Sequence, residues 1–358
     1  MAVYTRRYEK LREYMKECSL DAILMTADEN YRYFSGYHNP DGYMIVTADE
    51  SVVFADFRYF EAAKNECFPV CTVKEQKGGS FDEWLKSSGA YRIGFENGDL
   101  SVARYDKIKK TADEQKIELF PVDETITEIR SVKEREEVDL IVKAQRIAEK
   151  ALRELLSVIK CDMTELEVAA ELEYRMKKLG SPVPSFETIA VSGKASSVPH
   201  GVPRPVKLER GFLTIDFGAT VEGYHSDMTR TFCVGKADAE QKRLYETVLA
   251  AQTAAHGAIG PGVTGDEADA VARRIIDSAG YEGKFGHSLG HGVGLLIHEL
   301  PNLSPKIVGR KLVPGNVVTN EPGIYIEGSY GCRIEDMVFI TENGAENLTD
   351  FPHELIEI

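Results

Sequence analysis

The 358-residue sequence has no apolar run long enough to cross a bilayer, and residues 4–12 are charged where a signal peptide would be apolar. Positive charge is also scarce, because 43 Lys and Arg face 58 Asp and Glu for a net charge of −15. Nucleic acids and anionic membranes require clusters of basic residues. We therefore expect neither a membrane nor a nucleic-acid partner.

Cysteine is infrequent, and its 6 residues are scattered along the chain. Cys67 and Cys71 are close in sequence but lack the second pair that a zinc site would need. Without a disulfide framework, the simplest expectation is reduced thiols in a cytoplasmic protein. The hydrophobic share of 43% is ordinary for a folded protein, and the length suggests two domains.

Residues 1–125 alternate short apolar runs with polar, helix-like stretches. Apolar runs predict strands at 21–26, 43–46, 51–55 and 92–96, and helix-like segments occupy 58–65 and 102–111. This order predicts an N-terminal α/β domain with a mixed sheet, and no constellation of residues that could carry chemistry stands out in it.

Residues 126–358 have a different rhythm, in which two helices and a pair of strands occur twice. Capping-box spacing predicts helix starts at Ser131, Thr164, Asp238 and Thr264. Strand-like segments are found at 212–218, 224–234, 316–321 and 333–341. We predict a second domain of the α/β (α+β) class, built from two related halves whose strands join in one sheet with helices outside.

Two aspartates fall within the first strand pair. If the chain turns between Val221 and Glu222, Asp216 lies directly opposite Asp227, with Cβ atoms roughly 5 Å apart. Two carboxylates at that distance repel each other unless a positive charge lies between them. A metal ion is the natural candidate.

The second strand pair repeats this arrangement of acids. Glu321 ends a β-branched run before Pro-Gly, and strand alternation places Arg333 and Glu335 on one face. Four histidines lie in Gly- or Pro-rich loops, where glycine allows close backbone approach; they are His200, His287, His291 and His298.

Five segments occur in a characteristic order: 216–218, 226–231, 290–294, 321–325 and 333–336. Together they resemble the pita-bread metallopeptidases, and within that family the Xaa-Pro peptidases, namely prolidase and aminopeptidase P. The resemblance of the catalytic domain extends from about residue 131 to the C-terminus. Segments 31–36 and 57–63 are similar to the N-terminal domain of the same subgroup.

The resemblance implies a site for two divalent metal ions per subunit, with Mn²⁺ first and Co²⁺, Fe²⁺ or Zn²⁺ as alternatives. The implied ligands are Asp216, Asp227, His291, Glu321 and Glu335. Two divalent cations would neutralise the four carboxylates, and a mostly oxygen ligand set with one imidazole suits these metals.

The implied reaction is hydrolysis of the Xaa-Pro bond, at the N-terminus of peptides or in dipeptides, by a hydroxide that bridges the metals. Glu321 is expected to transfer the proton, and His200 and His298 to assist catalysis. These two histidines and His287 are expected to bind substrate, while Arg333 orients a ligand carboxylate. The subgroup also implies a homodimer.

Other functions within the same fold are less consistent with the sequence. Methionine aminopeptidases lack a leading domain of this kind, and creatinase works without metal although all five ligand types are present here. A non-proline-specific aminopeptidase and a catalytically silent binding module are the remaining alternatives. A module has no need of four mutually repelling carboxylates. Whether dipeptides or longer peptides are cleaved stays open, because closure of the far end of the cleft decides it.

Overall fold

The computed structural model describes residues 3–38 and 41–358, and the chain divides into compact units at 1–130 and 131–358. The division falls after residue 130, later than the expected 125. The reason is the helix that precedes the division, whose buried Arg130 lies 3.6 Å from Glu29 of the first unit. In the parts that the structure describes, no helix combines the length and apolarity needed to span a membrane.

The first unit is built around one mixed sheet. Its strands are β1 (Ala22–Met25), β2 (Tyr43–Thr47), β3 (Ser51–Ala55), β4 (Cys71–Glu75), β5 (Arg92–Phe95) and β6 (Glu118–Pro121). Its helices are α1 (Val3–Glu17), α2 (Asp28–Ser35), α3 (Phe60–Glu66), α4 (Ser80–Ser88), α5 (Val102–Gln115) and α6 (Asp123–Ser131). The strand order is β4-β3-β2-β1-β5-β6, with β1 antiparallel to β2 and parallel to β5. The expected mixed α/β domain is confirmed. β1 and β3 are fully buried, which explains why β1 is apolar throughout and β3 is apolar after Ser51.

The second unit begins with a half made of two helices and a three-stranded sheet. Its elements are α7 (Arg135–Leu156), α8 (Glu165–Lys178), β7 (Ile189–Ser192), the 3₁₀ turn η1 (Gly193–Ser197), β8 (Gly211–Phe217), β9 (Thr220–Val221), β10 (Tyr224–His225) and β11 (Met228–Val234). The strand order is β11-β8-β7. Apolar faces of α7 and α8 share one core with β8 and β11.

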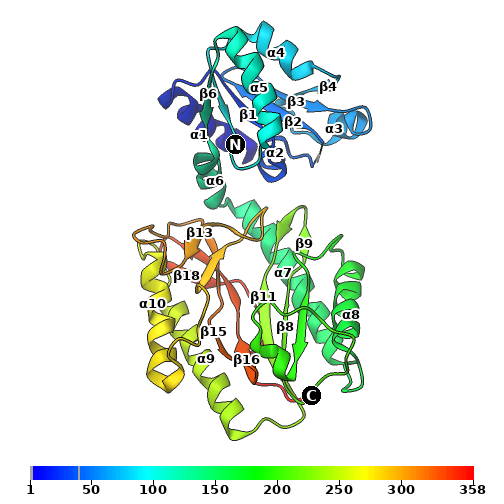
Figure 1. Ribbon diagram of the computed structural model, residues 1–358, viewed down its shortest axis with the longest axis vertical. Coiled ribbons are helices and arrows are strands. Elements are labelled where there is room, and N and C mark those ends of the chain that lie inside the picture. Colours follow the sequence, from blue (N-terminus) through cyan, green and yellow to red (C-terminus); the bar gives the residue numbers. More distant parts are fainter. Residues whose placement is uncertain (1–2, 39–40) are drawn as a thin grey trace. The chain divides into compact units, whose positions relative to one another are not determined.

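The other half repeats the plan with a second core. Its elements are α9 (Ala239–Ala258), α10 (Gly265–Ile276), the π turn η2 (Asp277–Tyr281), β12 (Gly290–Gly292), β13 (Glu299–Leu303), β14 (Val317–Asn320), β15 (Gly323–Ile326), β16 (Tyr330–Arg333), β17 (Asp336–Thr341) and β18 (Gly344–Asn347). Here the sheet order is β13-β12-β14-β17-β18. The strand predicted at 333–341 is divided into β16, which pairs with β15, and β17, which pairs with β14. Figure 1 shows α7 and α8 on one side of the strands and α9 and α10 on the other, so the predicted two-half plan is confirmed. The prediction of one shared sheet was wrong, because β11-β8-β7 and β13-β12-β14-β17-β18 are separate hydrogen-bonded sheets.

Three of the predicted capping boxes are present, at the N-termini of α8, α9 and α10. The fourth was placed three residues too early. Ser131 ends α6, whereas Glu134 caps α7 through a reciprocal pair with Glu137. The spacing at Ser131 satisfies the capping pattern, but the chain is still helical there and the next helix starts only at Arg135.

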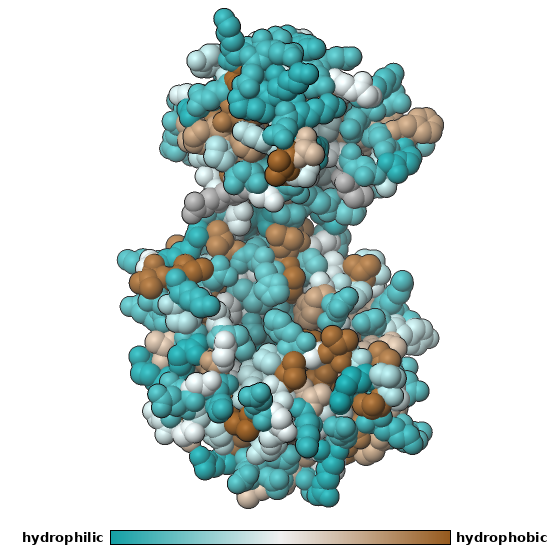
Figure 2. Space-filling model, in the orientation of Figure 1, coloured by the Kyte–Doolittle hydropathy of each residue, from teal (hydrophilic) through white to brown (hydrophobic). Residues whose placement is uncertain are grey.

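The surface drawn in Figure 2 is mainly hydrophilic. On the face drawn in Figure 2, hydrophilic residues dominate and hydrophobic residues occur in small separate groups. Small, scattered groups of apolar side chains are normal on a protein surface and do not by themselves indicate a binding site.

Candidate active site

The hairpin that carries the two aspartates has a different register from the one predicted. Its tip is formed by Glu222 (φ 47°) and Gly223 (φ 79°), and two positive φ values define the type I′ turn that suits a two-residue loop. As a result Asp216 of β8 pairs with Thr229, and not with Asp227. The predicted pairing was wrong by two residues. Because side chains alternate with a period of two, this shift keeps Asp227 on the same side as Asp216.

The remaining predicted ligands come from the other half of the second unit. His291 is in the centre of β12, Glu321 follows the last residue of β14, and Glu335 lies between β16 and β17. Close approach of β12 to β14 depends on Gly290, since a Cβ there would be only 2.1 Å from the carbonyl oxygen of Thr319. The sheet therefore brings His291 beside Glu321.

All of the predicted site residues lie on the wall of one cavity of about 490 Å³ within the second unit. They are Asp216, Asp227, His291, Glu321, Glu335, His200, His287, His298 and Arg333. Apolar side chains, including Phe186, Ile189 and Ile297, complete the wall. The cavity thus combines a cluster of charged groups with an apolar lining, as small-molecule sites usually do.

Asp227, His291 and Glu335 form a possible metal site, since one ligand atom from each lies within 4.8 Å of the others. The Nδ1 atom of His291 is 3.1 Å from the carbonyl oxygen of Gly292 and is assigned as the donor of that hydrogen bond. Its Nε2 lone pair then faces Asp227 at 3.6 Å and Glu321 at 3.3 Å. A lone pair directed at two carboxylates is unfavourable without a cation between them.

The pKa values of the carboxylates show how strongly the cluster resists carrying its full negative charge. Burial and the neighbouring Asp216 and Glu321 raise the pKa of Asp227, and burial and Asp227 raise the pKa of Glu335. Burial, opposed by Arg333 but reinforced by Asp216, raises the pKa of Glu321 to about 8. The donor set is therefore one that divalent cations would stabilise.

Arg333 holds the acidic groups in place through a network that sequence reasoning only partly found. Its side chain, 3% exposed, donates to Asp216 Oδ2 at 2.6 Å, to the Tyr325 hydroxyl at 2.6 Å and to Thr229 Oγ1 at 3.0 Å. Thr229 in turn donates to Glu335 at 2.7 Å. Arg333 was predicted to pair with a ligand carboxylate, and its contact with Asp216 fits that prediction.

Two threonines and a tyrosine of this network were missed. Thr229 and Thr319 stand two positions from the predicted ligands Asp227 and Glu321, and strand alternation could have placed them on the same face. Thr319 Oγ1 accepts from the backbone of His291 at 3.1 Å and donates to Glu321 at 3.0 Å. No sequence signal points to Tyr325 as a hydrogen-bonding group.

The histidines differ in how much of the ring remains available. His287 has Nδ1 2.9 Å from the Ser288 carbonyl and Nε2 2.9 Å from the Tyr325 hydroxyl, so both of its nitrogens are engaged within the protein. His200 and His298 are exposed at the cavity wall, and the ring of His298 is 4.1 Å from that of His291. Burial lowers the pKa of His287 and of His291 to about 4, so both rings are neutral at pH 7.

With this geometry in hand, comparison with known proteins identifies the family. Residues 139–342 match metallopeptidase family M24, and residues 7–132 match the creatinase/prolidase N-terminal domain. The chain therefore belongs to metallopeptidase family M24, which implies the use of divalent metal.

Relatives with named activities align with nearly the whole chain. The sequence is 42% identical to the Xaa-Pro dipeptidase of Pyrococcus furiosus, over 98% of this chain and 99% of that protein. The structure matches the Xaa-Pro dipeptidase from Bacillus anthracis with a TM-score of 0.94 at 37% identity, covering 99% of this chain and 100% of that one. It also matches the X-Pro aminopeptidase from Thermotoga maritima with a TM-score of 0.90 at 35% identity, covering 98% and 99%. The resemblance to the pita-bread Xaa-Pro peptidases is thus confirmed.

The loop that carries His200 is fastened at both ends by one buried carboxylate. Glu165, at the start of α8, accepts hydrogen bonds from the backbone N–H of Ser192 at 2.7 Å and of Arg204 at 3.0 Å. It also accepts from the Ser192 hydroxyl at 2.8 Å and from the Arg204 guanidinium at 2.7 Å. The residues between these two anchors include η1 and His200.

We expect Glu165→Gln to destabilise the second unit by about 2 kcal/mol or more, because an amide cannot accept all of these bonds. The Tm of that unit should fall by roughly 4–8 °C in thermal unfolding. Burial alone would raise the pKa of Glu165, but the bonds from Arg204 and Ser192 hold it below the ordinary value. The carboxylate therefore stabilises the fold above its unfolded pKa of about 4.3, and this contribution is lost as the pH falls through the lower folded pKa.

The difference between the wild type and Glu165→Gln should accordingly shrink below about pH 4. Glu167→Gln is the matched control, because glutamine also serves in the capping box of α8 and should leave Tm nearly unchanged. Equal Tm values for the Glu165 variant and the wild type at pH 7 would contradict the anchoring role.

Proposed function

We propose that this protein is an exopeptidase that hydrolyses the Xaa-Pro bond, in dipeptides or at the N-terminus of short peptides. The observation that carries the proposal is the convergence of Asp216, Asp227, His291, Glu321 and Glu335 on one cavity. Similarity to Xaa-Pro dipeptidases along the full length supports the substrate class.

We further propose that these five side chains hold two divalent cations, with Mn²⁺ the first candidate. In addition to the lone pair of His291, Asp216 Oδ1 is buried and lacks a hydrogen-bond partner among the residues that the structure describes. When bound, the cations supply Lewis acidity that lowers the pKa of water towards neutrality and polarises a carbonyl group. The four carboxylates supply the matching charge.

Glu321 is assigned as the group that moves a proton between the attacking water and the leaving nitrogen. Its Oε1 is 3.0 Å from Thr319 Oγ1, which fixes the orientation of the carboxyl group. His200 and His298 are assigned to the carbonyl oxygen of the substrate, because both are exposed at the cavity wall. His287, proposed to contribute to substrate binding, would do so together with Tyr325, since its ring nitrogens are already engaged.

The preference for proline follows from what the leaving residue lacks. A proline nitrogen has no N–H, so a site cannot recognise that bond by accepting a hydrogen from it. Recognition has to rely on the shape of the ring. Apolar side chains of the cavity wall, Phe186, Ile189 and Ile297 among them, offer surface for that contact.

Chelation is expected to abolish the cleavage of Ala-Pro by the purified full-length protein, and Mn²⁺ or Co²⁺ should restore it. The reason is that the carboxylate cluster cannot lower the pKa of water without cations. Release of the C-terminal amino acid is the measurement, and Ala-Ala is the matched substrate that lacks the ring. Cleavage that persists after metal removal, checked by elemental analysis, would refute the metal-dependent reaction. Equal rates on Ala-Pro and Ala-Ala would favour the non-proline-specific aminopeptidase.

A second candidate is an X-Pro aminopeptidase acting on longer peptides, favoured by the match to the Thermotoga maritima enzyme. Ala-Pro and Ala-Pro-Ala separate the two candidates when offered at equal concentration. Cleavage of the dipeptide alone selects the dipeptidase, and cleavage of the tripeptide selects the aminopeptidase. If neither substrate is cleaved, the remaining interpretation is the catalytically silent binding module.

We also propose that the protein is a cytoplasmic homodimer without nucleic-acid or membrane partners. Its cysteines are all unpaired, which supports a reducing compartment, and its net charge of −15 disfavours binding to phosphate-rich surfaces. The dimer follows from the resemblance to the Xaa-Pro peptidases. Light scattering on the purified protein tests it, and a monomeric mass would refute it.

A further inference from the structure

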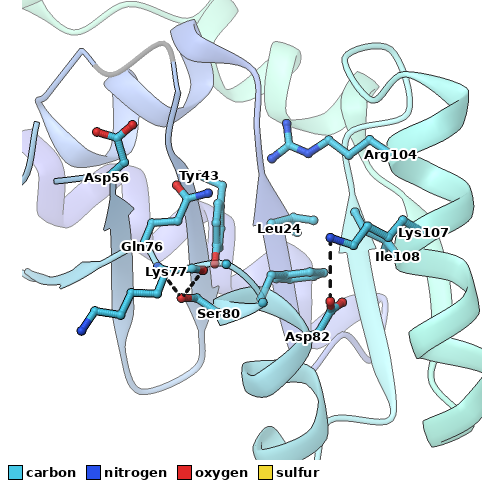
Figure 3. A pocket seen from close by; sticks show the side chains of 13 residues that line it. Leu24, Tyr43, Asp56, Gln76, Lys77, Ser80, Asp82, Arg104, Lys107 and Ile108 are labelled. Carbon is cyan, nitrogen blue, oxygen red and sulfur yellow. Dashed lines mark hydrogen bonds and ion pairs between the residues drawn. The ribbon is translucent and has the colours of Figure 1, made fainter. Parts of the chain in front are cut away.

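A second cavity, of about 300 Å³, lies within the first unit and contains none of the catalytic residues. Figure 3 shows it between the strands that carry Leu24 and Tyr43 and the helices α4 and α5. Its apolar wall consists of Leu24, Tyr43, Phe81 and Ile108. Polar side chains surround this wall, and they are Asp56, Gln76, Lys77, Ser80, Asp82, Arg104 and Lys107. Its size is at the lower end of the range for small-molecule sites.

The wall contains a polar atom without a partner. Tyr43 is 3% exposed, and its ring stacks on Phe54 at 4.6 Å and meets the edge of Phe81 at 5.7 Å. The Tyr43 hydroxyl is buried and makes no hydrogen bond with any residue that the structure describes. Gln76 Oε1 in the same wall is likewise buried and unpaired. A buried hydroxyl without a partner destabilises the fold, so a ligand that paired with it would gain free energy.

Most charged side chains around the cavity have partners within the described residues, and Lys77 lies 3.6 Å from Glu75. Asp56 is bonded to Arg58 at 3.0 Å, and Asp82 accepts from Thr111 at 3.1 Å with Lys107 at 4.0 Å. Arg104, by contrast, has no ion pair within residues 3–38 and 41–358. In Figure 3 it extends from α5 over the cavity.

The first turn of α4 lies at the other end of the cavity from Arg104, beside the Tyr43 hydroxyl. Ser80, Phe81 and Asp82 of that turn line the cavity, and the amino end of a helix attracts negative charge. Asp82 is itself negative, but Thr111 and Lys107 already pair with it. The backbone amide of Ser80 already donates to the carbonyl oxygen of Lys77 at 3.0 Å, so Arg104 is the group that remains for a carboxylate.

We propose that the first unit binds a small carboxylic acid with a flat apolar body. The carboxylate pairs with Arg104, and the body lies against Leu24, Tyr43 and Phe81. In Figure 3 the Tyr43 side chain points towards the loop at Lys77 and Ser80, while Arg104 lies on the opposite side of the cavity. A polar group at the far end of the ligand can therefore accept the Tyr43 hydroxyl hydrogen. The loop of Gly78 and Gly79, which has open space around it, can move to admit that group.

The protein contains its own reporter for this site. The single tryptophan of the chain, Trp84, stacks on Phe81 at 6.3 Å. The experiment titrates the full-length protein with 4-hydroxyphenylacetate and follows Trp84 fluorescence, excited where phenols do not absorb. We expect a saturable change. We expect weaker binding of phenylacetate, which lacks the group for Tyr43, and of the neutral 4-hydroxyphenylethanol, which lacks the carboxylate.

Two variants separate the contacts. Arg104→Gln should weaken binding of 4-hydroxyphenylacetate about tenfold, whereas Lys110→Gln, an exposed cation on the same helix, should leave it unchanged. Tyr43→Phe should abolish the advantage of 4-hydroxyphenylacetate over phenylacetate and, without ligand, should raise or preserve Tm because it removes an unpaired buried hydroxyl. No saturable fluorescence change, or an equal response from Arg104→Gln and the wild type, would overturn the proposal. The result does not depend on peptidase activity, since neither variant touches the catalytic cavity.

Discussion

Replacing Glu321 by glutamine is expected to lower kcat for Ala-Pro cleavage by about a thousandfold while the fold remains intact. Glutamine has nearly the same shape and can still accept from Thr319, which donates to Glu321 Oε1 at 3.0 Å. It cannot carry a proton from water to the leaving nitrogen, and it removes one negative charge from the cluster. Steady-state kinetics with saturating Mn²⁺ measures the effect.

The matched control is Glu346→Gln, an exposed glutamate on β18 of the same sheet, which should keep full activity. Thermal unfolding should give the Glu321 variant a Tm equal to or above that of the metal-free wild type, because burial beside Asp216 already raises the pKa of Glu321 to about 8. A folded, metal-loaded variant with near-normal kcat would remove Glu321 from the proton-transfer role.

The sequence specified the composition of the site more reliably than its local geometry. Asp216 and Asp227 were predicted to share a face, and they do, although the pairing was wrong by two residues. The missing information was the turn type. A Glu-Gly pair with positive φ at both positions closes the hairpin. Gly223 adopts its positive φ without the steric strain that a side chain would cause. Because side chains alternate between the two faces of a strand, a shift of two residues leaves both aspartates on the same face, and the predicted site was still correct.

Helix starts show a related limit. The box at Thr164 is real, whereas the same spacing at Ser131 is not used, because residues up to 131 are still part of α6. The capping-box spacing at Ser131 does not show that the preceding helix α6 extends to that residue. The buried ion pair of Lys133 and Glu299, with side chains 1% exposed each, was also unpredictable. Its partners are far apart in sequence, and only the fold brings them together.

The long-range contacts of Arg333 could not be predicted from the sequence either, because only the fold brings its partners near it. Alternation along one strand placed Arg333 beside Glu335, but it could not supply Tyr325 as a neighbour. The hydroxyl of Tyr325 joins Arg333 at 2.6 Å to His287 at 2.9 Å. This bond depends on the antiparallel pairing of β15 and β16, which places Gly323 opposite Arg333 and Tyr325 two positions further along β15.

Arg333→Lys is expected to weaken metal binding by 10- to 100-fold and to lower kcat/KM at limiting Mn²⁺ by a similar factor. The guanidinium bonds to Asp216, Tyr325 and Thr229 in three directions, and a lysine ammonium can replace only part of that geometry. Charge is conserved in this substitution, so any loss reports orientation of the carboxylates. Metal titration by calorimetry is the direct measurement.

Activity measured at saturating metal distinguishes a misoriented carboxylate from a misfolded site. If Arg333 acts by holding Asp216 in place, excess Mn²⁺ should recover much of kcat in the lysine variant, whereas a collapsed site would stay inactive at every metal concentration. Arg135→Lys provides the control, because Arg135 is 64% exposed and its pair with Asp139 is worth little. Wild-type metal affinity in Arg333→Lys would mean that the contacts at Asp216 and Thr229 do not tune the site. The carboxylates would then be positioned by the strands alone.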